Sequence, residues 1–475
     1  MFHYNNNILA VAGIYVCMLW CSVCYSKCII VVEADTQFLR SMDDSILIED
    51  DSSKRYNYKQ QQQQTNNKND NLIHALDPRL EYGGRWLTKA CGKEIRKNAD
   101  WPCSDIRFDV NVTQVNNDIT IIWYGVNTRI RVSIQKYNDD DTTMVEQEQQ
   151  YVFQGPTIWK KRMKSTIPSF SETGRFSVWI QKITTSCPFG PGIGGKVMGG
   201  SMFDFVGIET TTTTTTAIKI LAPRKKERKI VAIGASDTAG WCIDGTPSTS
   251  AFDYALGGWK YEDCGKTYEA QLATKFQASL SVQAISGIGL TQNAQAKTPW
   301  ILGSRTMPQY FNLTLQEENK NLWNFTKDGI VDLVIVSLGG NDYNHQKGDR
   351  PANDVFSNAY ISFLQFLFHI YDDNVMTNKK TTKILSICGM GDPYEKKRNP
   401  DNDRCSPCPH VEAAVKQFQR TVPDQISNRL FYKFIPCDGS VVHGTNDIGC
   451  NGHKNSLGQQ RVATFLEPTI SNITG

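Results

Sequence analysis

Residues 229–245 read KIVAIGASDTAGWCIDG and dominate the interpretation of the whole chain. Residues 229–233 form a β-branched run that stops at Gly234, which is typical of a buried strand ending in a tight turn. The turn presents Ser236 with small neighbours. A serine at the carboxyl end of a strand is a candidate nucleophile, although Gly-x-Ser also occurs in ordinary turns. The assignment therefore depends on the rest of the chain.

Beyond residue 228 the chain alternates strand-like and helical segments. Strand-like runs occupy residues 230–233, 280–285, 333–337, 384–388 and 430–435, and amphipathic stretches occupy residues 267–278, 355–371, 411–422 and 456–465. Repeated strand–helix units predict a parallel sheet covered on both faces by helices. In such sheets the reacting groups gather outside the carboxyl ends of the strands, which is where Ser236 falls.

The preceding part of the chain, from about residue 80 to residue 221, has a different texture. Short segments of strand character occupy residues 106–112, 119–124, 130–134, 176–183, 205–208 and 217–221. Residues 210–216 are all threonine and indicate a further strand or strand edge. No helical period competes with them, so we predict a β-sandwich of jelly-roll type. Only residues 223–228 separate this part from the first strand of the α/β part, so the two domains should be structurally joined.

The amino-terminal region predicts a leader and a linker. Residues 8–23 are apolar but fall short of the ~20 residues that span a bilayer. They are typical of a secretory signal, and an uncleaved membrane anchor is the alternative because the head lacks Lys and Arg. Residues 35–71 are too polar to form a core. The predicted domains are a signal peptide or anchor (1–34), a disordered polar linker (35–76), the jelly-roll sandwich (77–222) and the catalytic domain (228–475).

Composition narrows the class of protein. A net charge of +3 over 475 residues gives no argument for nucleic acid as a partner. Of 14 cysteines, four lie in the leader region (Cys17, Cys21, Cys24 and Cys28), and the ten others suit disulfides in an oxidising compartment. Four sequons, at Asn111, Asn312, Asn324 and Asn472, are compatible with glycosylation. The protein is therefore expected to be secreted, or membrane-anchored and facing a lumen or the exterior.

Three later features lie at strand ends or in the terminal loop. Ser286-Gly287-Ile288-Gly289 follows one predicted strand, where a glycine lets a backbone N–H approach a ligand. Asn341 follows the next strand in Gly339-Gly340-Asn341-Asp342, and His453 lies in a Gly-rich loop before the last helix. Together with Ser236 they form an ordered set of serine, glycine, asparagine and histidine.

This set resembles the SGNH (GDSL-like) hydrolases, whose four sequence blocks supply those residues. More narrowly, the chain is similar to carbohydrate esterase family 2, which places a jelly-roll domain directly before the SGNH domain. The resemblance includes EYGGR at residues 81–85, WP at 101–102, FVGI at 205–208 and LAP at 221–223, and covers roughly residues 80–466.

The resemblance implies a role for each of these residues. Ser236 would be the nucleophile and His453 the base. The oxyanion hole would comprise the backbone N–H groups of Ser236 and Gly287 and the side-chain amide of Asn341. The chemistry is consistent, because a hydroxyl needs an imidazole to take its proton and a tetrahedral oxyanion needs fixed donors.

Three positions depart from the family pattern. The first block reads Gly-Ala-Ser instead of Gly-Asp-Ser, with an acid only at Asp237. The aspartate that many members carry three positions before the histidine is Cys450, and the proline that often follows the histidine is Lys454. The ring of His453 must then find another acceptor, either the Asp447 carboxylate or a backbone carbonyl of the Asn451-Gly452 turn. We predict the Asn451 carbonyl, as in some family 2 members, with Asp447 shaping the loop from further out.

Two further motifs have competing interpretations. Trp241 is a possible platform for a sugar ring, but core packing is the alternative. Cys405-Ser406-Pro407-Cys408-Pro409-His410 suggests redox or zinc chemistry, yet no second ligand pair accompanies it, so disulfides with other cysteines are expected.

The sequence thus predicts a serine esterase that removes acyl groups, above all acetyl, from hydroxyls of a polysaccharide or oligosaccharide. No metal or organic cofactor is implied, and a monomer is expected. The alternatives are a catalytically weakened carbohydrate-binding or cell-wall protein and an SGNH esterase acting on lipids or other small esters.

Overall fold

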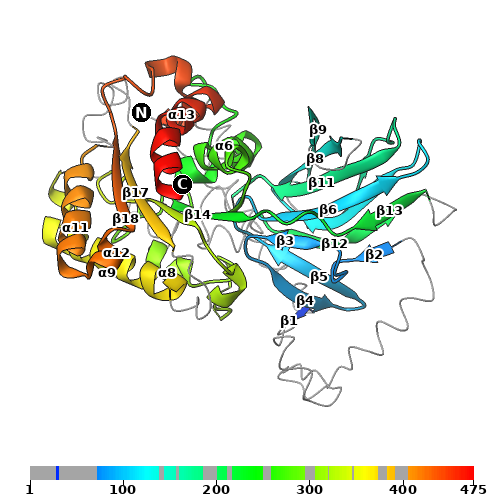
Figure 1. Cartoon of the computed structure of the whole chain (residues 1–475), viewed down its shortest axis with the longest axis horizontal. Helices are drawn as coiled ribbons and strands as arrows, with labels where there is room; N and C mark the ends of the chain where they lie inside the picture. The colour runs from blue at the N-terminus through cyan, green and yellow to red at the C-terminus, as the bar shows by residue number, and fades with distance from the viewer. Residues whose placement is uncertain are drawn as a thin grey trace, which may run out of the picture.

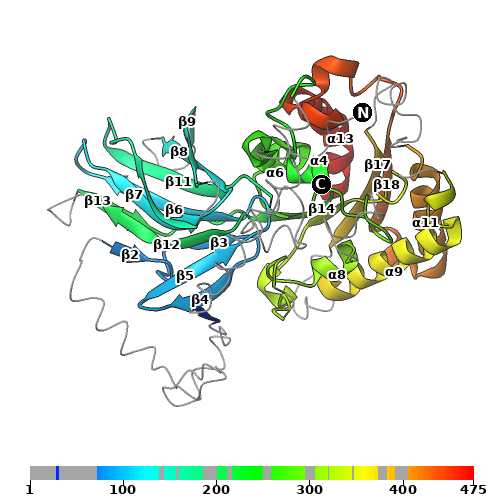
Figure 2. The ribbon, with the colours of Figure 1, turned by 180° about the vertical axis from the view of Figure 1, so that it is seen from behind.

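The chain folds into an all-β part and an α/β part that lie side by side (Figures 1 and 2). The structure is a computed structural model that describes residues 28–30, 72–138, 144–156, 160–185, 201–210, 217–249, 258–294, 305–318, 320–344, 347–372, 382–390 and 405–475. Two antiparallel sheets form the first part and a parallel sheet forms the second.

The all-β part is a sandwich of two sheets. One sheet contains β1 (Cys28–Ile30), β4 (Leu87–Cys91), β5 (Glu94–Ala99), β12 (Phe203–Thr210), β7 (Ile119–Gly125) and β10 (Lys161–Ile167) in that order, with β2 (Leu72–His74) paired to β12. The other contains β13 (Ile218–Leu221), β6 (Asp105–Val112), β11 (Gly174–Lys182), β8 (Arg129–Tyr137) and β9 (Met144–Gln154), with β3 (Glu81–Gly83) paired to β6. Alternate apolar residues of β6 and β7 meet in one core between the sheets.

Two short strands lie within the predicted leader and linker. Cys28–Ile30 pairs with β4 and lies inside the predicted leader (1–34). Leu72–His74 pairs with β12 and lies inside the predicted linker (35–76). The rest of the predicted leader and linker, and residues 211–216 of the threonine-rich segment, lie outside the described residues.

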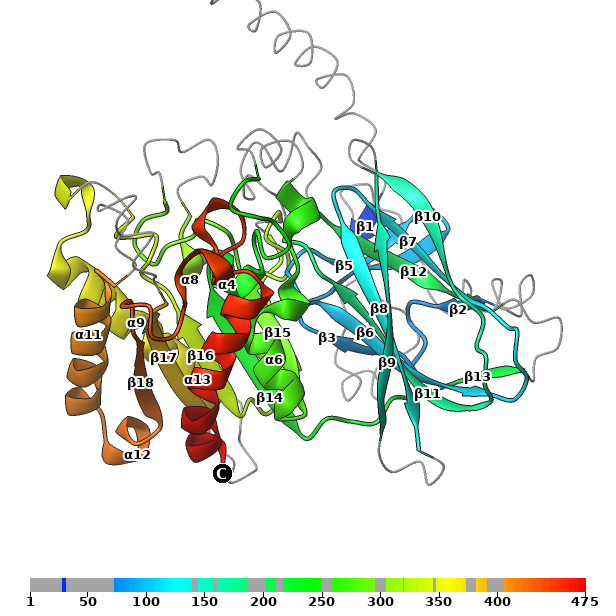
Figure 3. The same cartoon turned by 90° about the horizontal axis from the view of Figure 1, so that it is seen from above.

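The α/β part confirms the predicted parallel sheet. Its strand order is β15 (Ala278–Ala284), β14 (Arg228–Gly234), β16 (Leu333–Ser337), β17 (Lys383–Gly389) and β18 (Leu430–Ile435). One face packs on α9 (Asn353–Asp372) and α11 (Cys408–Thr421), and the other on α6 (Tyr268–Lys275) and α13 (Ser456–Thr474), as Figure 3 shows. Shorter helices are α4 (Ser236–Ala239), α8 (Met307–Phe311) and α12 (Asp424–Ser427), with 3-10 turns η2 (Gly258–Tyr261), η3 (Cys264–Lys266), η4 (Phe325–Asp328), η5 (Lys347–Asp349), η6 (Gly444–Asp447) and η7 (Cys450–Gly452).

The last helix is longer than predicted. The sequence pattern ended it at residue 465, but α13 continues through Pro468 to Thr474. Leu466, Ile470 and Ile473 are buried against the sheet. Their packing outweighs the hydrogen bond that a proline removes from a helix. None of the helices within the described ranges is long and apolar enough to cross a membrane.

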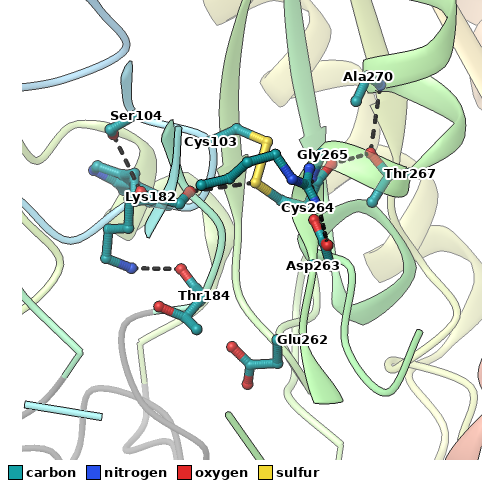
Figure 4. The surroundings of a disulfide bond; sticks show 12 residues. Cys103, Ser104, Lys182, Thr184, Glu262, Asp263, Cys264, Gly265, Thr267 and Ala270 are labelled. Atoms are coloured by element: carbon teal, nitrogen blue, oxygen red, sulfur yellow. Dashed lines mark hydrogen bonds and ion pairs between the residues drawn. A yellow bond between two sulfur atoms is a disulfide. The ribbon is translucent and has the colours of Figure 1, made fainter. Parts of the chain in front are cut away.

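A disulfide joins the sandwich to the α/β part. Cys103, between β5 and β6, bonds to Cys264 on η3, and both cysteines are buried (Figure 4). The backbone N–H groups of Cys103 and Cys264 donate to the carbonyls of Lys182 and Ile183 at 2.9 and 3.0 Å. A salt bridge from Arg131 of the sandwich to Asp263 lies beside it. The expected structural junction between the two domains is therefore confirmed.

Buried charges reinforce this junction. Lys182 donates from Nζ to the carbonyls of Thr184 and Thr185, and Glu262 accepts from Thr185 N at 2.5 Å. Burial lowers the pKa of Lys182 and raises the pKa of Glu262. Because buried polar groups are costly unless paired, this network favours a single docking of the two domains.

Candidate active site

The register of the parallel sheet brings the predicted site residues to one edge. Gly234 at the end of β14 pairs with Ala284 of β15 and with Ser337 of β16. Ser236, Gly287 and Asn341 follow these three strand ends within a few residues. The close approach of Thr238 favours glycine at position 234, because a Cβ there would lie 2.0 Å from Thr238 Oγ1. The sheet thus collects residues that lie up to about a hundred positions apart.

Ser236 and His453 are in direct contact. Ser236 begins α4, and its Oγ lies 2.7 Å from His453 Nε2. On the other side of the ring, Nδ1 lies 3.0 Å from the Asn451 carbonyl oxygen. A carbonyl can only accept, so Nδ1 carries the proton and Nε2 is left as the acceptor for the serine hydroxyl. This is the tautomer that a general base requires.

His453 lies in the histidine loop, which we define as residues 436–455 between β18 and α13. Within it, Asn451 adopts a left-handed conformation with φ of 52°. Asparagine tolerates this region better than most residues. The carbonyl of His453 accepts from Gly449 N at 2.7 Å. These local bonds fix the turn whose carbonyl faces the ring.

Asp447, the alternative partner of His453, has other contacts. It is fully buried, and its Oδ2 accepts from His443 N at 2.6 Å and lies 2.9 Å from Arg461 Nε. Its backbone carbonyl accepts from Asn455 N at 2.9 Å. These bonds connect Asp447 to His443 and Asn455 within the histidine loop and to α13. They support a structural role for Asp447 in shaping the loop, without direct contact with the ring of His453.

We expect Asp447→Asn to reduce kcat by less than about tenfold. The amide keeps the size and part of the hydrogen bonding, and Arg461 can turn to water. A triad acid replaced by its amide costs about 10⁴ in the serine-protease precedent. Steady-state kinetics on an acetate ester measures the effect, with circular dichroism as the control for folding. A loss near 10⁴ in a folded variant would make Asp447 the third catalytic residue.

The candidate oxyanion donors follow the ends of three neighbouring strands, β14, β15 and β16. The N–H of Ser236 belongs to the first turn of α4, where helix N–H groups have no intrahelical acceptor. Gly287 has φ of 80°, a conformation that favours glycine, in the turn after β15. Asn341 Nδ2 donates to the Ile288 carbonyl at 2.7 Å, next to Gly287. One amide hydrogen thus orients Asn341 and the other is available for an oxyanion.

Asp342 supports this arrangement, although the sequence analysis assigned it no role. Its buried carboxylate accepts from the backbone N–H groups of Leu290, Thr291 and Gln292 at 2.6 to 3.1 Å. Burial raises the pKa of Asp342, and these hydrogen bonds oppose the rise. Because Asp342 follows Asn341 directly, it ties the asparagine to the loop that begins at Gly287. The only sequence feature that pointed to this role was the position of Asp342 directly after Asn341.

A second disulfide explains the cysteine at the position where many family members have an acid. Cys450 bonds to Cys242, and both are buried. The N–H of Cys450 also donates to the Cys242 carbonyl at 3.2 Å. The bond links the segment just after Ser236 to the histidine loop across 208 residues. A covalent tether therefore occupies the place where an acid would hold the histidine.

We expect removal of this disulfide to lower the free energy of unfolding by about 2–5 kcal/mol. The loop it closes is long, and loop-closure entropy grows with length. Denaturant unfolding of Cys242→Ala/Cys450→Ala without reductant measures the loss. The control is Cys405→Ala/Cys437→Ala, which opens a bond with a separation of 32 residues and should cost less. Equal stability of wild type and the first variant would contradict the prediction.

Side-chain placement bears on two interpretations of the sequence. Trp241 is only 2% exposed and packs with the Cys242–Cys450 disulfide and Tyr261, which favours core packing over a sugar platform. Cys408 bonds to Cys388, and Cys405 to Cys437, as the disulfide interpretation expected. Within the described ranges no cluster of three or more His, Cys, Asp or Glu side chains is arranged to hold a metal ion.

Comparison with known proteins points to one group of enzymes. No family model matches the chain. The cellulase/esterase CelE of Acetivibrio thermocellus is 30% identical over 155 residues, which are 32% of this chain. The chain spans only 17% of the length of that protein.

Solved structures match over most of the chain. A family two carbohydrate esterase from Clostridium thermocellum, in complex with cellohexaose, is 19% identical with a TM-score of 0.60, covering 83% of this chain and 98% of the other. A family two carbohydrate esterase from Cellvibrio japonicus is 16% identical with a TM-score of 0.61, covering 85% and 97%. The predicted resemblance is confirmed: the chain has the two-domain fold of the family two carbohydrate esterases.

Proposed function

We propose that the chain is a family two carbohydrate esterase that removes acetyl groups from carbohydrate hydroxyls. The observation that carries the proposal is the contact of 2.7 Å between Ser236 Oγ and His453 Nε2, with Nδ1 held by a carbonyl. Ser236 Oγ attacks the ester carbonyl carbon while Nε2 takes its proton. The tetrahedral oxyanion accepts from the N–H groups of Ser236 and Gly287 and from Asn341 Nδ2.

The second half of the reaction uses the same residues. The intermediate collapses to an acyl-enzyme on Ser236, and the sugar alkoxide leaves with the proton from His453. A water molecule then gives a proton to His453 and attacks the acyl carbon, which releases acetate and restores Ser236. Because the carbonyl of Asn451 holds the ring without a full charge, we propose a dyad in place of a triad.

The substrate and setting are part of the proposal. A carbohydrate substrate is supported by the cellohexaose complex of the Clostridium thermocellum esterase. Four disulfides among the described residues support a secreted protein, or one anchored to a membrane and facing a lumen or the exterior. We further propose that the sandwich is a jelly roll and that the protein acts as a monomer.

A non-catalytic carbohydrate-binding protein is the second candidate. A related carbohydrate esterase is described as having an active site with divergent catalytic and non-catalytic binding functions, and this chain has Gly-Ala-Ser in its first block. The test measures acetate released from acetylated xylan, mannan and oligosaccharides, and compares acetyl with longer-chain chromogenic esters. Binding to the polysaccharides without acetate release would favour the second candidate. Preference for long acyl chains would favour a lipid esterase.

A further inference from the structure

The residues that directly follow Ser236 and His453 form an ion pair with each other. The Nζ of Lys454 lies 2.9 Å from Asp237 Oδ2, across a separation of 217 residues. The Lys454 side chain is 1% exposed and that of Asp237 is 12% exposed. A largely buried ion pair therefore joins α4 to the histidine loop, immediately beside the Ser236–His453 contact.

The backbone is anchored on both sides of this pair. Gln459 on α13 donates from Nε2 to the Asp237 carbonyl at 3.1 Å. Lys454 forms an isolated antiparallel bridge with Ile448. Because both backbones are held, the contact between the two charges constrains the distance between α4 and the histidine loop.

A buried ion pair is a strong constraint because water cannot replace either partner. Separating the charges would leave each in surroundings of low dielectric constant at a high cost. The hydrogen bond between Ser236 and His453 is a weaker tether, since it joins two neutral groups. The ion pair is thus better suited than the hydrogen bond to hold the two segments together.

We propose that Asp237 and Lys454 are positioning residues, whose ion pair holds His453 Nε2 against Ser236 Oγ and whose opposite charges cancel at the imidazole. The inference rests on the proposed esterase function. Lys454 alone would disfavour the imidazolium that forms when His453 takes the serine proton, and Asp237 alone would favour it. Paired, they leave the basicity of His453 to its contact with the Asn451 carbonyl.

Other titratable groups lie near the pair and are kept in every variant. On α6, Tyr268 and Glu269 lie close to Thr238, the residue after Asp237, and burial raises the pKa of Glu269 to about 7. In the histidine loop, His443 and Asp447 form a separate group with Arg461 of α13. The charge of Asp237 contributes to the raised pKa of Glu269, so Asp237→Asn also lowers the pKa of Glu269. All five groups remain in every variant, and a difference between variants therefore comes from Asp237 or Lys454, either directly or through Glu269.

The test compares Asp237→Asn, Lys454→Met and the double variant in steady-state kinetics as a function of pH. The midpoint of the acid limb of kcat/KM should fall in Asp237→Asn and rise in Lys454→Met, by about 0.5 pH unit or more. In the double variant the midpoint should return to that of wild type. Its kcat should still be clearly below that of wild type, by up to about tenfold, because the ion pair no longer holds the two segments together. Its KM should stay within about twofold of the wild-type value.

The double variant also protects the test against misfolding. Lys454→Met alone removes the cation that contacts Asp237 Oδ2, whereas replacing both partners of a buried ion pair is often close to neutral for stability. The control is Asp372→Asn/Arg429→Met, which removes an ion pair of 2.7 Å between the end of α9 and the start of β18. It should leave both kcat and the midpoint unchanged.

Two outcomes would overturn the inference. A wild-type kcat in the folded double variant would show that the ion pair does not position His453. Single variants whose midpoints do not shift, or shift in the same direction, would show that the two charges do not balance at the ring.

NMR titration of His453, assigned with His453→Asn, measures the same midpoints without turnover. The ¹⁵N shift of Nε2 should move toward that of a free imidazole in the double variant. If wild type has no esterase activity, the proposed function fails while this NMR test still decides the role of the pair.

Discussion

Ser236→Ala should reduce turnover to less than about a hundredth of the wild-type rate. Loss of a serine nucleophile has cost about 10⁶ in kcat in the subtilisin precedent, so a hundredfold loss is a cautious threshold. The structure gives the reason, because Ser236 Oγ is in contact with Nε2 of His453, the ring nitrogen that acts as the acceptor when Nδ1 donates to the Asn451 carbonyl. Hydrolysis of a chromogenic acetate ester by purified wild type and variant measures the loss.

Folding should survive this substitution. Ser236 follows a strand end and is 9% exposed, and the substitution removes only one oxygen, so it leaves no large cavity. The control is Ser279→Ala, which removes a hydroxyl that donates to the Arg228 carbonyl at the opposite end of β14 and β15. It should keep full activity. A Ser236→Ala variant that retains more than a hundredth of the wild-type rate would show that the nucleophile lies elsewhere.

The parallel sheet was readily predictable because its strands are buried on both faces. Such strands form continuous β-branched runs, and β18 was predicted at its observed bounds of Leu430–Ile435. In the sandwich, β6 and β7 were also predicted, since alternate residues face one core. Seven strands were missed: the short strands β1, β2 and β3, and the longer strands β4, β5, β9 and β10. β9 and β10 are edge strands, and the exposed side chains of β10 are mostly Lys and Arg, so their sequences lack a clear apolar alternation.

The candidate site also contains residues that the sequence predicted and contacts that it did not. Ser236, Gly287 and Asn341 were predictable because each follows a strand end, and parallel strands bring their carboxyl ends to one edge. The Cys242–Cys450 and Asp237–Lys454 contacts were not predictable. They join positions separated by 208 and 217 residues, and a sequence does not specify which cysteines or charges pair.

Two of these contacts give a physical account of the departures from the SGNH pattern. Cys450 at the usual acidic position is bonded to Cys242, and Lys454 at the usual proline position is paired with Asp237. Both contacts join the segment that begins at Ser236 to the histidine loop. Nothing in the structure explains the alanine at position 235. The loss of an acid near His453 is thus accompanied by one covalent and one ionic connection between the same two segments.

Asn341→Ala should lower kcat by about 100-fold to 1000-fold, with little change in KM. Its Nδ2 donates to the Ile288 carbonyl at 2.7 Å, which fixes the amide plane and leaves the second hydrogen for the oxyanion. A donor aligned in advance acts mainly on the transition state, where negative charge develops on the carbonyl oxygen. Steady-state kinetics on the same acetate ester separates the two parameters. The control is Asn344→Ala, three residues further along the same loop, whose effect should be small. A change confined to KM would make Asn341 a substrate-binding residue and remove it from the oxyanion hole, whereas a loss in kcat alone would place its amide at the developing charge.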